Sequence, residues 1–338
     1  MANSGTGDAD VDAALRAGRG LVSTTRAMDC GIPRFTIRRL AKAGVLTCLA
    51  KGIYAETTSL VQLPPWPRFA VRTRAFVASS TDDAHACDFS AAALWRLPMI
   101  GPPPPMPRVL RPGSAHWGRS TTSQGKVRFG FLPPEARTWT AGIRVTDVAY
   151  TGVDVARTSP RLQGLIVADW ILAHGVSREA MTQVADNLRL YKGISAAQWV
   201  IGRADGRSES ALETAGRLVM LNFDLPTPVA NAWVLGLPKP RRPDLLLPDH
   251  GIILEADGAV KYDNRPDAAA IVTQEKERDW ELRSLGFDVL RFDWSLAVHR
   301  PALLAARIRN LMQQRRGRPT PTCWQLDPPW ALANTATP

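Results

Sequence analysis

Residues 242–258 restrict the local fold more than any other segment, because residues that favour a tight turn separate two short apolar runs. Pro248 and Gly251 supply the turn, and the pattern predicts a β-hairpin with strands at 244–247 and 252–257. A turn centred between positions 249 and 250 sets the antiparallel register of these strands, and with it the pairs of side chains that face each other.

Acidic side chains lie on both predicted strands. In this register Asp244 is directly opposite Glu255, with Cβ atoms roughly 4.5–5.5 Å apart. Asp257 follows Glu255 by two positions and lies on the same face of its strand. Like charges this close on apolar strands cost stability unless a divalent cation or a basic side chain neutralises them. The hairpin therefore predicts a metal site, and the alternative is a structural cluster of ion pairs.

Length and charge indicate several domains and a polyanionic partner. The chain has 338 residues, which fits two or three domains. Its 42 basic and 31 acidic residues give a net charge of +11, which favours nucleic acid as a partner. The cysteines show no paired short spacing, which fits a reducing cytoplasm. Because no segment resembles a targeting signal or a membrane span, we expect a cytoplasmic protein without a membrane partner.

Residues 1–60 are predicted to form a winged helix-turn-helix domain. The expected elements are three helices and two strands of a small wing, at residues 11–17, 23–29, 33–43, 45–49 and 52–55. Ser23 is the expected cap of the second helix. This order of elements is typical of a domain that places its third helix in the major groove of DNA.

The third helix carries the predicted contacts with double-stranded DNA. Its expected inward stripe consists of Phe35, Ile37, Leu40 and Ala41. The expected DNA contacts are basic side chains on its outward face and at the tip of the wing: Arg34, Arg38, Arg39, Lys42 and Lys51. Such residues suit phosphate contacts, and one or two arginines suit bidentate contact with guanine. The alternative interpretation is a charged helix face exposed to solvent.

Residues 61–200 are expected to form an α+β middle region without a catalytic constellation. Residues 57–70 contain three prolines and favour a linker. Helices are expected at 90–97, 162–173 and 178–190, and strands at 107–111, 126–132 and 142–148. We interpret the region as a scaffold or as a surface for a protein partner.

Residues 201–314 are predicted to form a mixed sheet flanked by helices. The expected order is a helix at 208–221 capped by Ser208, a strand at 227–235, the hairpin, a helix at 272–284, a strand at 287–294 and a helix at 301–314. Residues 315–338 form a basic and then proline-rich tail, expected to be disordered or loosely attached, whose basic start suits phosphate contacts. Packing of Trp324 and Trp330 onto the domain is the alternative.

Two groups of motifs carry a resemblance to known families. The C-terminal motifs are Ser210-Ala-Leu-Glu213, Arg242-Pro-Asp244, Leu254-Glu-Ala-Asp-Gly258, Lys261-Tyr262, Glu275-Lys276 and Leu285-Gly-Phe-Asp-Val-Leu-Arg-Phe292. Residues 207–297 thereby resemble the restriction-endonuclease-like superfamily, near the very-short-patch-repair endonucleases. Residues 20–55 resemble the winged-helix domain of AbiEi-type antitoxins from abortive-infection systems. Together the two domains resemble a group of uncharacterised actinobacterial proteins, so the expected fold is a multi-domain α/β chain.

The resemblance implies a nuclease site that uses Mg²⁺ or Mn²⁺. Asp244 and Glu255 would hold the metal through oxygen ligands, and Glu213 on the preceding helix would complete the acidic set. The alternative for Glu213 is an ion pair with Arg217, one helical turn away.

The superfamily usually has a lysine two positions after the second carboxylate, and this chain has Asp257 there. Lys261 and Lys276 are the candidates to replace that lysine in orienting or activating the water. The alternative is that both lysines form ion pairs with the acidic residues.

Two functions follow. In the first, the winged helix delivers a Mg²⁺-dependent endonuclease to DNA in a defence, toxin–antitoxin-like or repair system. In the second, the protein is a DNA-binding regulator or antitoxin whose nuclease-like domain has lost turnover. Asp257 favours the second function, whereas the retained pair of Asp244 and Glu255 favours the first. We expect the first function, the nuclease.

Overall fold

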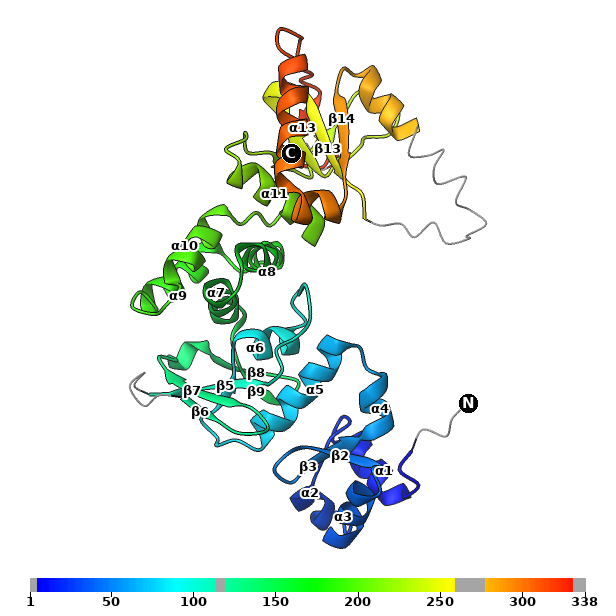
Figure 1. The fold of residues 1–338 in the computed structure, drawn as a ribbon, viewed down its shortest axis with the longest axis vertical. Helices are drawn as coiled ribbons and strands as arrows, with labels where there is room; N and C mark the ends of the chain where they lie inside the picture. The colour runs from blue at the N-terminus through cyan, green and yellow to red at the C-terminus, as the bar shows by residue number, and fades with distance from the viewer. Residues whose placement is uncertain (1–4, 114–118, 259–276, 331–338) are drawn as a thin grey trace, which may run out of the picture. The chain divides into compact units, whose positions relative to one another are not determined.

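The computed structural model describes residues 5–113, 119–258 and 277–330. The chain is mixed α/β, as expected, and divides into two compact units (Figure 1). The first unit comprises Met1–Val167 and Val176–Gly202, and the second comprises Ala168–Gly175 and Arg203–Pro338. Within the described residues, no helix has the length and apolar character needed to cross a membrane.

The chain up to residue 56 contains the three helices and two wing strands that the sequence predicts, and a short strand, β1, that it does not predict. The elements are α1 (Ala9–Ala17), β1 (Val22–Ser23), α2 (Thr24–Asp29), α3 (Arg34–Lys42), β2 (Leu46–Ala50) and β3 (Ile53–Glu56). Ser23 caps α2, as expected, because its hydroxyl accepts a hydrogen bond from the Arg26 amide. The strands form an antiparallel sheet in the order β1-β3-β2. Apolar side chains from α1, α3 and β2 share one core.

The expectation that Phe35 faces inward is wrong. Phe35 is 68% exposed, and Thr36 is buried in its place beside Ile37 and Leu40. Two residues advance an α-helix by about 200°. A side chain two positions before the buried Ile37 therefore lies on the opposite face, among the basic residues of α3.

The expected linker at 57–70 is instead helical. Its two helices are α4 (Thr57–Gln62) and α5 (Pro65–Ala78). The prolines do not break α5, because they occupy its first turn, where a missing amide hydrogen costs nothing. Arg74 in α5 donates hydrogen bonds to the carbonyls of Gly18 and Arg19, which attaches this helix to the preceding α-β segment.

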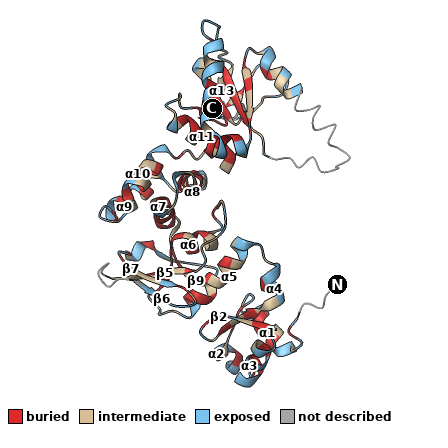
Figure 2. Cartoon of the chain, in the orientation of Figure 1, coloured by how far each residue is buried: buried red, intermediate tan, exposed pale blue. Residues whose placement is uncertain are grey.

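A six-stranded mixed sheet and a group of helices complete the first unit. The strands are β4 (His85–Ala86), β5 (Arg108–Pro112), β6 (Arg119–Thr121), β7 (Lys126–Gly130), β8 (Arg137–Thr140) and β9 (Ile143–Thr146), in the order β6-β7-β5-β4-β9-β8. The helices are α6 (Asp88–Trp95), α7 (Val148–Thr158), α8 (Arg161–Ala173), α9 (Arg178–Asn187) and α10 (Ile194–Arg203), and the part of α8 from Ala168 onward belongs to the second unit. Figure 2 shows that α7 is buried over most of its length. Asp154 on α7 is fully buried, and its carboxylate pairs with Arg128 and Arg157.

The second unit is built on a four-stranded mixed sheet in the order β10-β12-β13-β14. Its elements are α11 (Ala211–Asn222), β10 (Val229–Ala230), β11 (Trp233–Val234), β12 (Leu245–Leu247), β13 (Ile252–Ala256), β14 (Asp288–Phe292), α13 (Pro301–Gln314) and β15 (Trp324–Gln325), and residues 277–284 are also helical. β12 and β13 are antiparallel, whereas β13 and β14 are parallel. This order of helices and strands follows the predicted one, and α11 and α13 pack against each other.

Two local expectations in this unit are wrong. Ser210, rather than Ser208, caps α11, because its hydroxyl accepts a hydrogen bond from the Glu213 amide. The strand expected at 227–235 is broken into β10 and β11 at Asn231, which has a left-handed φ of 53°. A residue in that conformation cannot continue an extended strand.

The tail is attached to the second unit as far as it is described, so the expectation of a disordered or loose segment is wrong up to residue 330. Trp324 and Gln325 pair with β11 in an antiparallel ladder. The rings of Trp330 and Trp233 meet edge to face, with centroids 4.8 Å apart. The two tryptophans therefore pack onto the domain, which was the alternative interpretation.

Two helical glycines provide a test of this packing. A Cβ atom at Gly216 in α11 would lie 2.5 Å from the ring of the buried Phe292, whereas one at Gly202 in α10 would meet no atom within 4 Å. We expect Gly216→Ala to lower the free energy of unfolding by about 1–3 kcal/mol. Gly202→Ala should raise it by up to about 1 kcal/mol, through helix propensity alone. Urea unfolding of both variants measures this, and shifts of the same sign would contradict the described packing of α11.

Candidate functional site

The β12–β13 hairpin has the predicted register. Leu245 pairs with Leu254 and Leu247 with Ile252, and one further step of this register places Asp244 opposite Glu255. Gly251 closes the turn with a left-handed φ of 60°, a conformation that favours glycine. The Asp244 carboxylate reaches across to the facing strand and accepts a hydrogen bond of 2.7 Å from the amide of Ala256.

Asp244 and Glu255 form a desolvated carboxyl pair. Glu255 is only 6% exposed, and burial raises its pKa to about 8; Arg278 opposes this rise, whereas the charge of Asp244 and a hydrogen bond between the two carboxyls add to it. Burial also raises the pKa of Asp244. Because Glu255 is buried and the adjacent carboxylate of Asp244 repels its negative charge, the carboxyl of Glu255 favours its protonated form and donates a hydrogen bond to Asp244.

Two arginines that the sequence analysis did not predict complete this cluster. Arg278, in the helical segment 277–284, lies with its Nη2 3.1 Å from Oε1 of Glu255. Arg291 in β14 is the parallel-register partner of Glu255, and its guanidinium lies 2.9 Å from both Asp257 and Asp279. The sequence could have indicated Arg291, because it lies at the centre of the predicted strand 287–294. A strand that runs parallel to β13 brings its central residue beside Glu255.

Glu213 lies near the pair but is held by neighbouring groups. Its buried carboxylate accepts hydrogen bonds from the Glu209 amide at 2.9 Å and from Asn231 Nδ2 at 2.8 Å. Burial raises its pKa, and the charge of Asp244 adds to this rise. The alternative ion pair with Arg217 is wrong.

Arg217 binds a different acid. Its guanidinium pairs with the buried carboxylate of Asp169 at 2.7 Å, and Thr214 donates a hydrogen bond to the same carboxylate. This buried pair joins α11 to residues 168–175 within the second unit.

The remaining predicted site residues differ in what can be said of them. The side chain of Asp257 is 45% exposed and points to Arg291 rather than into the carboxyl pair. Lys261 and Lys276 lie outside the described residues. Among residues 5–113, 119–258 and 277–330, no group of three or more His, Cys, Asp or Glu side chains is arranged to hold a metal ion. The donor chemistry of Asp244 and Glu255 nevertheless fits Mg²⁺, which prefers one or two carboxylates.

The predicted DNA-contact residues all lie at the surface of the first unit. Arg34, Arg38, Arg39 and Lys42 are exposed along α3, and Lys51 is exposed at the turn between β2 and β3. Within the described residues, none of these five side chains forms an ion pair with an acid. Their charges are therefore available to a polyanion.

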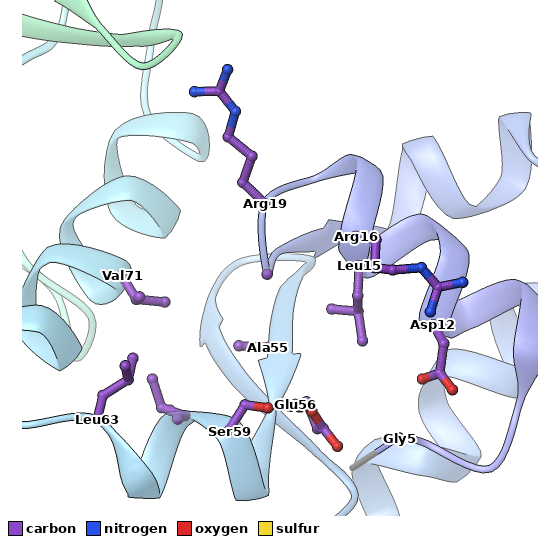
Figure 3. Close-up of a pocket in the computed structure, with 12 residues that line it drawn as sticks. Gly5, Asp12, Leu15, Arg16, Arg19, Ala55, Glu56, Ser59, Leu63 and Val71 are labelled. Carbon is purple, nitrogen blue, oxygen red and sulfur yellow. Dashed lines mark hydrogen bonds between the residues drawn. The ribbon is translucent and has the colours of Figure 1, made fainter.

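A separate cavity of about 410 Å³ lies between α1, the end of β3, and helices α4 and α5 (Figure 3). Leu63 and Val71 extend into it, whereas the Arg19 side chain points away. None of the predicted carboxylate or DNA-contact residues lines this cavity, so it is distinct from both proposed sites.

Comparison with known proteins leaves the function open. No protein-family model matches the chain. Two uncharacterized proteins of Mycobacterium tuberculosis are similar to part of it: MT2308 of strain CDC 1551 / Oshkosh and Rv2248 of strain ATCC 25618 / H37Rv. Each is 30% identical over 178 residues, which are 52% of this chain and 64% of the relative. The matched segment thus spans less than two thirds of either relative, and neither name states an activity.

The raised pKa of Glu255 predicts a pH-dependent stability. Its carboxyl has an ordinary pKa of 4.5 in the unfolded chain and one of about 8 in the folded protein. The folded state therefore holds an extra proton between these values, and stability falls as pH rises from about 4.5 to about 8. Glu255→Gln mimics the protonated acid and should lack this loss, so that it exceeds wild type by on the order of a few kcal/mol near pH 9.

Urea unfolding across this pH range measures the difference. Asp327→Asn, at an exposed acid of the same unit, is the matched control and should follow the wild-type profile. Profiles of wild type and Glu255→Gln that stay parallel between about pH 5 and about pH 8 would contradict the raised pKa of Glu255.

Proposed function

We propose that the protein binds double-stranded DNA through α3 and the β2–β3 turn, and that its second unit hydrolyses phosphodiester bonds with Mg²⁺ or Mn²⁺. The carrying observation is the pair formed by the buried Glu255 and the half-buried Asp244. A desolvated carboxyl pair with a raised pKa is the arrangement expected of a functional site, and a divalent cation would replace the proton that Glu255 retains.

The proposal for DNA binding rests on residues 9–56. Three helices followed by an antiparallel strand pair have the order of a winged helix-turn-helix domain. The exposed face of α3 combines arginines and a lysine, which suit phosphates and guanine, with the exposed Phe35 ring, which suits the methyl group of thymine.

The proposal for catalysis gives each acidic residue a task. Asp244 and Glu255 would hold the metal, and Glu213, fixed by Asn231, would complete the acidic set. When bound, the metal would lower the pKa of a water and stabilise charge on the scissile phosphate. Arg278 stands beside Glu255 and can bind a phosphate oxygen.

Sites of this type usually have a lysine at the position of Asp257. In this chain Asp257 pairs with Arg291. Lys261 and Lys276 therefore remain the candidates to orient the attacking water.

A second candidate function is a DNA-binding regulator or antitoxin without nuclease turnover. The specific observation that favours it is that Arg278 and Arg291 already pair with Glu255 and Asp257. Such pairs neutralise the acids without a metal, as a structural ion cluster does. Both candidates share the DNA-binding surface of α3 and differ only in what the second unit does.

Nicking of supercoiled plasmid separates the two functions. We expect Mg²⁺- or Mn²⁺-dependent cleavage that EDTA abolishes, and a loss of about 100-fold or more in Asp244→Ala and Glu255→Ala. Asp327→Ala, which removes an exposed acid elsewhere in the unit, should cleave like wild type. Folded protein that binds DNA but does not cleave it would favour the regulator.

The DNA-binding surface has its own test. Arg38→Ala/Arg39→Ala removes two exposed arginines from α3 and should weaken binding to duplex DNA about tenfold or more, because both phosphate and base contacts are lost. The control is Lys126→Ala/Arg189→Ala, which removes two exposed charges elsewhere in the first unit. Equal affinity of the two double variants, measured by fluorescence anisotropy, would rule out α3 as the recognition element.

A further inference from the structure

A strongly basic cavity of about 470 Å³ lies in the second unit, at the turn of the β12–β13 hairpin and the carboxyl end of α13. The charged and titratable side chains among its described lining residues are Asp249, His250, Arg309, Arg315, Arg316 and Arg318. Four arginines thus face one aspartate. The proposed catalytic residues do not line this cavity, and neither does α3.

Arg315 is a buried residue of this lining. It is only 7% exposed, its Nη1 lies 2.8 Å from Asp288, and its Nη2 donates to the carbonyl of Pro319. A Cβ atom at position 251 would lie 2.5 Å from the same guanidinium, so Gly251 is needed for the close approach. The arginine is therefore held in place by its surroundings and is not a loose surface cation.

Two buried nitrogen atoms of the lining have no hydrogen-bond partner among the described residues. They are Nε of Arg315 and Nδ1 of His250. A buried polar atom without a partner costs on the order of 1–3 kcal/mol, so such atoms usually serve a ligand or another partner. The helix dipole accounts for the basic side chains at the carboxyl end of α13. It does not account for two unpartnered nitrogen atoms in the same lining.

The chemistry of this lining suits a phosphate group. Arginine forks bind phosphate oxygens with two parallel hydrogen bonds, and four arginines line this cavity. Arg309, Arg316 and Arg318 are exposed at the rim, where they can meet a charged ligand without prior desolvation.

We propose that this cavity binds a phosphate of a nucleic-acid backbone, which rests on the proposed function of a DNA-acting protein. His250 lies in the turn that precedes β13, and Glu255 lies near the other end of that strand. The three residue steps from Ile252 to Glu255 alone span about 10 Å at roughly 3.3 Å per residue, which equals about three base-pair steps of B-form DNA. The cavity would hold a phosphate some nucleotides from the one at the carboxyl pair and so fix the position of the backbone.

The test measures binding, not cleavage, with the full chain in EDTA. Arg316→Ala/Arg318→Ala removes two exposed rim arginines, and Lys239→Ala/Arg300→Ala removes two exposed charges of the same unit outside the cavity. In a salt titration of duplex binding, the slope of log K against log salt should become less steep by about 1 to 2 in the rim variant, because one or two phosphate contacts are lost. The control should keep a slope closer to that of wild type.

A second arm identifies the source of the phosphate. Inorganic phosphate, compared with chloride at equal ionic strength, should raise the melting temperature of wild type and of the control, and less that of the rim variant. A phosphate effect without any change in the salt slope would mean that the cavity takes a free phosphate compound and would overturn the nucleic-acid assignment. Equal responses of rim variant and control in both arms would overturn the site itself.

Failure of the proposed function gives a different result. If wild type does not bind duplex DNA, the proposal for DNA binding falls, and with it the backbone assignment of this cavity. The phosphate arm still decides whether the cavity binds an anion. If DNA binds but plasmid is not nicked, only the proposed catalysis falls, because the salt titration does not depend on cleavage.

Discussion

Burying Glu255 beside the half-buried Asp244 puts two carboxyl groups where water screens their charges poorly, and the polar contacts around them reduce the resulting repulsion. The amide of Ala256 donates to Asp244, and Arg278 approaches Glu255. The strands that carry the pair cannot move away to relieve the charge, because the leucines of β12 and the isoleucines of β13 are fully buried. The apolar hairpin thus keeps the two carboxyl groups close together despite their repulsion. A proton, an arginine or a metal ion can neutralise this repulsion.

Local patterns were sufficient to predict the register of this hairpin and the elements up to residue 56. Turn residues and apolar runs act over a few positions, so Gly251 and the strands on either side could be read directly. Errors arose where neighbouring positions compete for the same role. Ser208 and Ser210 both suit a helix cap, and only the surrounding packing selects Ser210. Phe35 is apolar, but the helical period places it outside.

Contacts between distant segments could not be predicted in the same way. Arg291 reaches the acidic cluster because β14 runs parallel to β13, whereas Arg278 reaches it from the helical segment 277–284. The pair of Asp169 and Arg217 joins residues 48 positions apart. Spacing predicts that Asp244 faces Glu255, but it does not predict the position of Arg278 or the basic cavity, because these depend on how distant segments pack.

The pairing of β11 with β15 has a consequence for biosynthesis. Trp233 and Val234 find their strand partners roughly ninety residues later in the chain, at Gln325 and Trp324. At about 5–20 residues per second, the ribosome needs between about 5 and about 20 seconds to make that stretch. During this interval the edge of β11 has unpaired backbone groups that can join strands of other nascent chains. Pairing with β15 therefore closes an edge at which this unit is open to misassembly.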